Sequence, residues 1–60
     1  MIYKATIITK DQTVNKTFPT IAMAAEWLDS NAGNMDATML IETFNEAGVK
    51  TDGFVYSEKI

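Results

Sequence analysis

The side chains that enzymes use most often for nucleophilic and acid–base chemistry are missing from this chain. Its 60 residues include no His and no Cys, and all five basic residues are lysines. Ser30 and Ser57 therefore have no histidine that could activate either hydroxyl as a nucleophile. The same absences exclude disulfides and zinc sites. We predict a protein that is not an enzyme and that carries no metal and no other cofactor.

Carboxylates are the remaining candidates for acid–base chemistry. Glu42 and Glu46 are four residues apart and share a face if this segment is helical. A glycosidase-like pair needs a cleft that desolvates one of the two acids, and a chain of this size rarely encloses one. The three glycines stand isolated, so there is no Gly-rich phosphate loop, and an Asp-rich EF-hand loop is also missing. We interpret Glu42 and Glu46 as solvated acids that repel each other mildly.

The elements that would position these residues begin with a β-hairpin. Residues 2–9 and 13–18 are rich in β-branched and aromatic side chains, and a short polar break separates them. Alternation places Val14 and Phe18 inward. Lys16 shares their side, so we expect it near an edge of the sheet or with its amine extended to water. Pro19 ends the hairpin because proline cannot donate to a strand ladder.

An α-helix is predicted from Ile21 onward. Thr20 is a suitable N-cap for it, and Gly33 is a suitable terminator. Apolar residues recur at the helical spacing i, i+3, i+4, i+7 and i+11. They are Ile21, Ala24, Ala25, Leu28 and Ala32.

Residues 34–48 have two interpretations. A second helix capped by Asn34 or Asp36 would align five apolar residues, Ala37, Leu40, Ile41, Phe44 and Ala47, and end at Gly48. The alternative is a strand over 38–44 followed by a turn at 45–48, which would resemble the ββαββ fold of the small immunoglobulin-binding bacterial domains. We favour the helix, because a strand places Met39 and Ile41 on the face opposite Leu40 and Phe44. Residues 51–53 are typical of a turn, and 54–57 of a last strand.

Charge is unevenly distributed along the chain and indicates a binding surface. Residues 1–20 carry three lysines and one acid, whereas residues 21–60 carry two lysines and seven acids. Acids on the two predicted helices would form a face that could dock on a basic groove. Met23 and Trp27 lie on the flank of the first helix, where they either meet a partner, meet a second copy or pack within the domain. The predicted partner-binding residues are Met23, Glu26, Trp27, Asp29, Glu42 and Glu46.

Two short motifs follow one another within residues 3–28. Lys16-Thr17-Phe18-Pro19-Thr20 precedes Ala24-Ala25-Glu26-Trp27-Leu28. This resembles the AP2-like modules of phage-type integrases, in which a hairpin ending in K-T-F-x-T leads into a helix with A-x-x-W-L. Those modules are usually basic, whereas this chain has a formal net charge of −3. The resemblance implies DNA contact from the sheet face opposite the helix, through Lys4, Thr6, Ile8, Asn15 and Thr17.

We therefore expect residues 1–60 to form one small α+β domain. Its antiparallel sheet, made of the N-terminal hairpin and a C-terminal strand, would pack on one or two helices in the order β-β-α-α-β, with ββαββ as the alternative. The expected function is that of an acidic regulator or inhibitor of the bacteriophage or mobile-element type, which docks on a basic surface of a host protein. DNA binding is the alternative function. No apolar stretch approaches the ~20 residues that span a membrane, so we expect a cytoplasmic protein.

Overall fold

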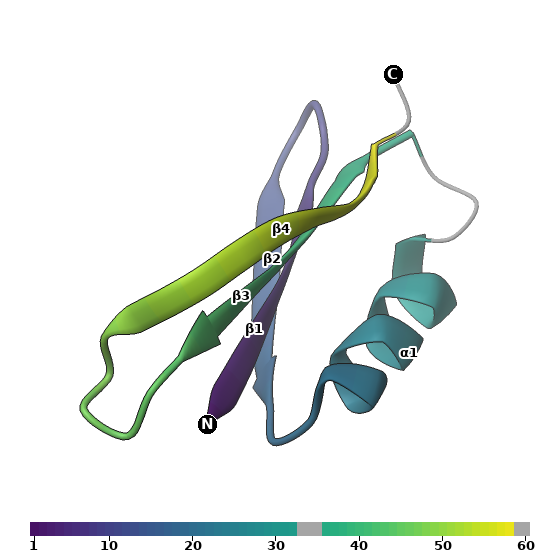
Figure 1. The fold of residues 1–60 in the computed structure, drawn as a ribbon. Coiled ribbons are helices and arrows are strands. Elements are labelled where there is room, and N and C mark those ends of the chain that lie inside the picture. Colours follow the sequence, from purple (N-terminus) through teal and green to yellow (C-terminus); the bar gives the residue numbers. More distant parts are fainter. Residues whose placement is uncertain (33–35, 59–60) are drawn as a thin grey trace.

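The computed structural model describes residues 1–32 and 36–58, which form four strands and one helix (Figure 1). In chain order these are β1 (Ile2–Ile8), β2 (Thr13–Phe18), α1 (Ile21–Ala32), β3 (Thr38–Phe44) and β4 (Lys50–Glu58). The predicted α+β class with an antiparallel sheet is confirmed. The order is ββαββ, so the favoured β-β-α-α-β order is wrong.

The four strands form one antiparallel sheet in the order β2-β1-β3-β4. The N-terminal strand β1 therefore lies inside the sheet, and β2 and β4 are its edges. Helix α1 covers one face, where it contacts β1, β2 and β3 (Figure 1). We call the other face the open face.

The predicted hairpin and helix are both present, and short-range chemistry explains how they connect. The hairpin closes where the Thr9 backbone N–H donates to the Gln12 carbonyl at 2.8 Å. Pro19 follows the last residue of β2, and the Thr20 hydroxyl then accepts a hydrogen bond from the Met23 N–H at 3.2 Å. This is the predicted N-cap. Only Pro19 and Thr20 connect β2 to α1, so the helix starts close to that edge strand.

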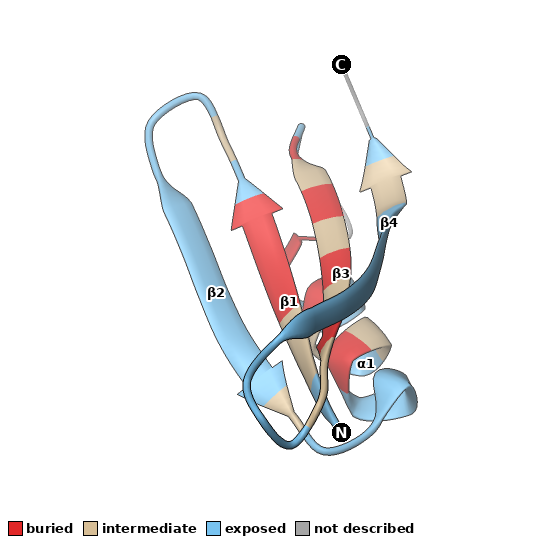
Figure 2. Ribbon diagram, turned by 60° about the vertical axis from the view of Figure 1, so that its left-hand side comes forward, coloured by how far each residue is buried: buried red, intermediate tan, exposed pale blue. Residues whose placement is uncertain are grey.

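The core lies between α1 and the two central strands (Figure 2). Its largest fully buried side chains are Leu28, Met39 and Ile41. Most of the other buried apolar residues are alanines, which let the helix approach the sheet closely. Of the predicted helical stripe, Ala24, Leu28 and Ala32 are buried. Ile21, the first residue of α1, is 46% exposed.

Residues 38–44 form a strand and not the favoured second helix. Met39, Ile41 and Thr43 are buried toward α1, and the alternate residues Leu40 and Phe44 lie half-buried on the open face. The prediction counted apolar residues on both sides of a strand as a reason against it. A central strand accepts them, because it lies between β1 and β4, whose side chains pack beside its own on both faces of the sheet.

The last strand is longer than predicted, and its turn lies earlier. Residues 51–53, predicted as a turn, belong to β4. The chain instead reverses at 45–49, where the Asn45 side chain accepts from the N–H groups of Ala47 and Val49 at 2.9 and 3.1 Å. Gly48 completes the turn with φ of 80°. The predicted cap at Asn34 and terminator at Gly33 lie outside the described residues.

Candidate functional site

The flank of α1 that faces the edge strand β2 carries an unusual set of exposed and half-buried side chains. Its residues follow the spacing i, i+3, i+4, i+7 and i+8, so they form a continuous strip along the helix. Trp27 is half-buried at the centre of the strip, and Met23 is 47% exposed one turn before it. The strip consists of Met23, Glu26, Trp27, Ser30 and Asn31.

Trp27 packs against the neighbouring edge strand, and its backbone carbonyl accepts a bond from Asn31. Its ring contacts Phe18 of β2, with ring centroids 5.7 Å apart and a tilt of 48°. The side-chain amide of Asn31 donates to the Trp27 backbone carbonyl at 2.8 Å. A tilted aromatic pair contributes about 0.5–1.5 kcal/mol beyond its buried area. The Trp27 ring is therefore packed on β2, and the Asn31 side chain is held next to it on the helix.

Two hollows flank Trp27 along this side of the molecule. One, of about 290 Å³, is lined by Phe18, Met23, Glu26, Trp27, Ser30 and Asn31. The other, of about 180 Å³, is lined by Ile7, Thr9, Gln12, Val14, Trp27 and Asn31. Because Trp27 and Asn31 line both, the two hollows form one surface, which we call the β2–α1 groove.

The groove combines an apolar floor with charges at its edge. Val14 of β2 is 42% exposed, although alternation places it on the helix side of the sheet. Lys16 lies between Val14 and Phe18 on that side, and its Nζ is 5.7 Å from the Phe18 ring centroid. The expectation that Lys16 sits near an edge is confirmed, because β2 is an edge strand. Glu26 is exposed at the margin of the larger hollow.

Asp29 is on α1 but serves a different contact. Its Oδ2 accepts a hydrogen bond from the Tyr56 hydroxyl of β4 at 3.0 Å. This bond, with smaller contributions from desolvation and from the charge of Asp29, raises the pKa of Tyr56 above its usual value of 10.0. Asp29 thus ties the helix to the far edge of the sheet and does not line the groove.

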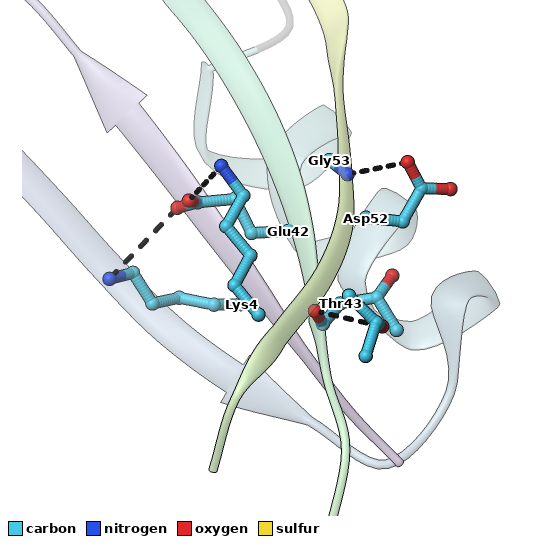
Figure 3. A network of polar contacts seen from close by, with 7 residues as sticks. Lys4, Glu42, Thr43, Asp52 and Gly53 are labelled. Carbon is cyan, nitrogen blue, oxygen red and sulfur yellow. Dashed lines mark hydrogen bonds and ion pairs between the residues drawn. The ribbon is translucent and has the colours of Figure 1, made fainter.

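Glu42 lies on the open face, where it pairs with lysines from two other strands (Figure 3). Its Oε2 is 3.2 Å from Lys50 Nζ, and its Oε1 is 4.0 Å from Lys4 Nζ. Glu46 is in the β3–β4 turn. The single acidic face predicted from two helices is therefore wrong: Glu26 and Asp29 lie on α1, and Glu42 is on the opposite side of the sheet.

The residues predicted for DNA contact do lie together on the open face. The register pairs Lys4 with Thr17 and Thr6 with Asn15, in neighbouring positions of β1 and β2. Thr6 is only 6% exposed, and its Oγ1 has no hydrogen-bond partner among residues 1–32 and 36–58. A further hollow of about 540 Å³ lies at one end of this face. It is lined by Met1, Ile2, Lys4, Thr17, Phe44, Asn45, Glu46 and Gly48.

The part of the chain that the structure describes offers no metal-binding cluster of His, Cys, Asp or Glu. Within the same residues, no helix has the length and apolar character to cross a membrane. No family model, curated protein or solved structure matches this chain.

Of the six predicted partner-binding residues, the fold brings Met23, Glu26 and Trp27 together and separates Asp29, Glu42 and Glu46 from them. The predicted site did not include the β2 side of the groove. Strand alternation already placed Val14, Lys16 and Phe18 on one side, and the short Pro19-Thr20 connection brings that side near the helix. These two signals together could have identified the groove.

Proposed function

We propose that this chain is a non-enzymatic protein-binding module, and that it binds its partner through the β2–α1 groove. The observation that supports this most strongly is the combination of Trp27, packed on Phe18, with exposed Met23 and Val14 beside two hollows. Aromatic anchors and methionines are enriched at the centres of protein interfaces. The absence of His, Cys and Arg supports a role without catalysis.

The partner that fits is a protein with a basic surface. The chain has a formal net charge of −3, and Glu26 stands exposed at the margin of the groove. A negative field of this kind accelerates association with a positive partner, and salt screens the effect. We therefore place the chain among small acidic regulators or inhibitors, of the type that bacteriophages and mobile elements direct at host proteins in the cytoplasm. A nucleic-acid-binding surface of such a host protein would supply the positive charge.

Differential capture tests this proposal. The immobilised chain, the variants Met23→Ser and Glu26→Lys, and the control Glu46→Lys are each exposed to lysate, and retained proteins are identified by mass spectrometry. Glu46→Lys makes the same charge change at an exposed turn residue outside the groove. A protein retained by wild type and Glu46→Lys, but lost with both groove variants, supports the proposal. Identical retention by all four would contradict it.

DNA binding is a second candidate, because Lys4, Thr6, Asn15 and Thr17 occupy adjacent positions on the open face. Two features count against it. Affinity for duplex DNA comes largely from neutralising phosphates, yet Lys4 and Lys50 both pair with Glu42. Thr6 is buried. Fluorescence anisotropy with a labelled duplex at low salt decides: DNA binding predicts an affinity that falls with salt and with Lys4→Ala, but not with Lys10→Ala in the hairpin turn.

A further inference from the structure

Strand β2 is an open edge of the sheet, and its one inward-pointing charge is Lys16. The other edge, β4, has two register irregularities against β3, and these are the features with which proteins commonly block an edge. The register between β1 and β2 runs from Tyr3–Phe18 to Ile8–Thr13 with no shift. Almost all of β2 is exposed, as Figure 2 shows.

The hydrogen bond that closes the hairpin identifies which backbone groups of β2 are free to bind another strand. Thr9 N–H donates to the Gln12 carbonyl, so this pair is a hydrogen-bonded one. Hydrogen-bonded and non-bonded pairs alternate along an antiparallel ladder. Val14, Lys16 and Phe18 therefore direct their N–H and C=O groups toward β1. Thr13, Asn15 and Thr17 direct theirs away from the sheet.

The β2–α1 groove lies directly beside this edge. Val14 lines the smaller hollow and Phe18 the larger one. These two residues are four apart along β2, which is about 13 Å in a strand. Lys16 lies midway between them. A strand added to β2 would thus place one side chain at each hollow and the side chain between them opposite Lys16.

We propose that β2 takes up an extended segment of the partner as a fifth strand, with apolar side chains at positions i and i+4 and a carboxylate at i+2. This inference rests on the proposed function and specifies how the groove is used. The main-chain hydrogen bonds of Thr13, Asn15 and Thr17 would supply affinity, and the two hollows and Lys16 would supply specificity.

A second copy of this chain fits the same edge less well. Two β2 strands can pair antiparallel so that Val14 of each copy lies opposite Phe18 of the other, which satisfies both hollows. This register places Lys16 opposite Lys16, and like charges directly opposite each other destabilise a strand pair. A carboxylate at that position instead forms an ion pair, so the edge favours a foreign segment.

The test uses the blocked peptide Lys-Thr-Ile-Thr-Glu-Thr-Ile-Thr-Lys, titrated against the full chain with the fluorescence of its one tryptophan as signal. A control peptide of the same composition moves the second isoleucine one position earlier, so that its two isoleucines point to opposite faces. We expect saturable binding of the first peptide and at least tenfold weaker binding of the second. Equal affinity for the two, or no binding of either at millimolar concentration, would overturn the inference.

Two protein variants separate backbone pairing from side-chain recognition. Asn15→Pro removes an outward N–H and leaves the bonds to β1 intact, a position at which edge strands accept proline. We expect at least tenfold weaker binding, with the control Asn15→Thr unchanged. The second variant is Lys16→Glu. Because the Lys16 side chain is exposed, we expect this variant to fold as wild type does. Lys16→Glu should weaken binding of the peptide with Glu at its centre and allow binding of a peptide with Lys there. If peptide preference does not reverse in this way, the carboxylate assigned to position i+2 is wrong.

The outcomes also distinguish this inference from the proposed function. A lysate protein that is lost with Glu26→Lys but retained by Asn15→Pro and Lys16→Glu would leave the proposed function intact and overturn strand addition. If wild type and the groove variants retain the same proteins, and neither peptide binds, both the proposed function and strand addition are overturned. A concentration-dependent dimer in sedimentation that Asn15→Pro abolishes would show that a second copy occupies the edge, against the foreign segment proposed here.

Discussion

At the scale of single residues, two polar side chains have environments that a sequence does not reveal. Thr6 is on the open face, yet its neighbours bury it, and its Oγ1 finds no partner in the part of the chain that the structure describes. Tyr56 is on an edge strand, yet its hydroxyl bonds to Asp29 of the helix. In both cases the surrounding residues are distant in the chain. Each of these two environments leads to a testable prediction about stability.

Replacing Thr6 by valine should stabilise the protein. Valine keeps the β-branched shape, and it removes a buried hydroxyl to which no described residue hydrogen-bonds. The expected increase in the free energy of unfolding is about 1 kcal/mol. Urea denaturation measures it, with Thr17→Val as the control at an exposed position of the same face. A loss of stability on Thr6→Val would show that the hydroxyl has a partner in solution.

Stability should fall at high pH through Tyr56. Its hydrogen bond to Asp29 needs the neutral phenol and raises its pKa above 10.0 in the folded state. The contribution is therefore fully present below the unfolded value and is lost as pH rises through the folded pKa. We expect the stability advantage of wild type over Tyr56→Phe to shrink above pH 10. An advantage that stays constant from pH 7 to beyond the Tyr56 transition would contradict this.

At the scale of elements, sequence patterns predicted β1, β2 and α1, and they failed where tertiary neighbours decide. Thr20 and Pro19 act through local hydrogen bonds, so the boundary between β2 and α1 could be predicted. Residues 38–44 could not, because their apolar pattern fits a helix stripe as well as a central strand. Two of the six predicted site residues were lost with that error, because Glu42 lies on the open face of β3 and Glu46 in the turn that follows it.

The β3–β4 turn depends on one backbone conformation. Gly48 has φ of 80°, and a Cβ there would meet nothing within 4 Å. The cost of Gly48→Ala is therefore purely that of the left-handed backbone, about 1 kcal/mol in the free energy of unfolding. Gly48→Asn should cost less, because asparagine tolerates this region better. Equal losses for the two variants in urea denaturation would point to a cause other than backbone strain.

At the scale of the whole molecule, stability is concentrated in few side chains. Chains of this size have total free energies of unfolding of roughly 3–9 kcal/mol. Leu28 is fully buried between helix and sheet, and only Met39 and Ile41 match it among the large side chains of the described core. Loss of any one of these contacts therefore removes a large share of the total.

Leu28→Ala should leave a substantial fraction of the protein unfolded at 25 °C. Deletion of a buried leucine costs about 2–5 kcal/mol, which is comparable to the whole stability. Ile21→Ala on the same helix should cost less than about 1 kcal/mol, because Ile21 is 46% exposed. Circular dichroism with thermal unfolding compares the two variants. A cooperative transition of Leu28→Ala close to that of wild type would contradict a core this thin.

The position of β1 inside the sheet affects the order in which the chain can fold as the ribosome makes it. The first hairpin pairs β1 with β2, but the other side of β1 waits for β3, which is synthesised only after the whole helix. At typical translation rates, synthesis from the end of β1 to the end of β3 takes about 2–7 s. Until then one edge of the apolar strand β1 lacks its partner, and a chaperone that binds extended apolar segments would find its target at that edge.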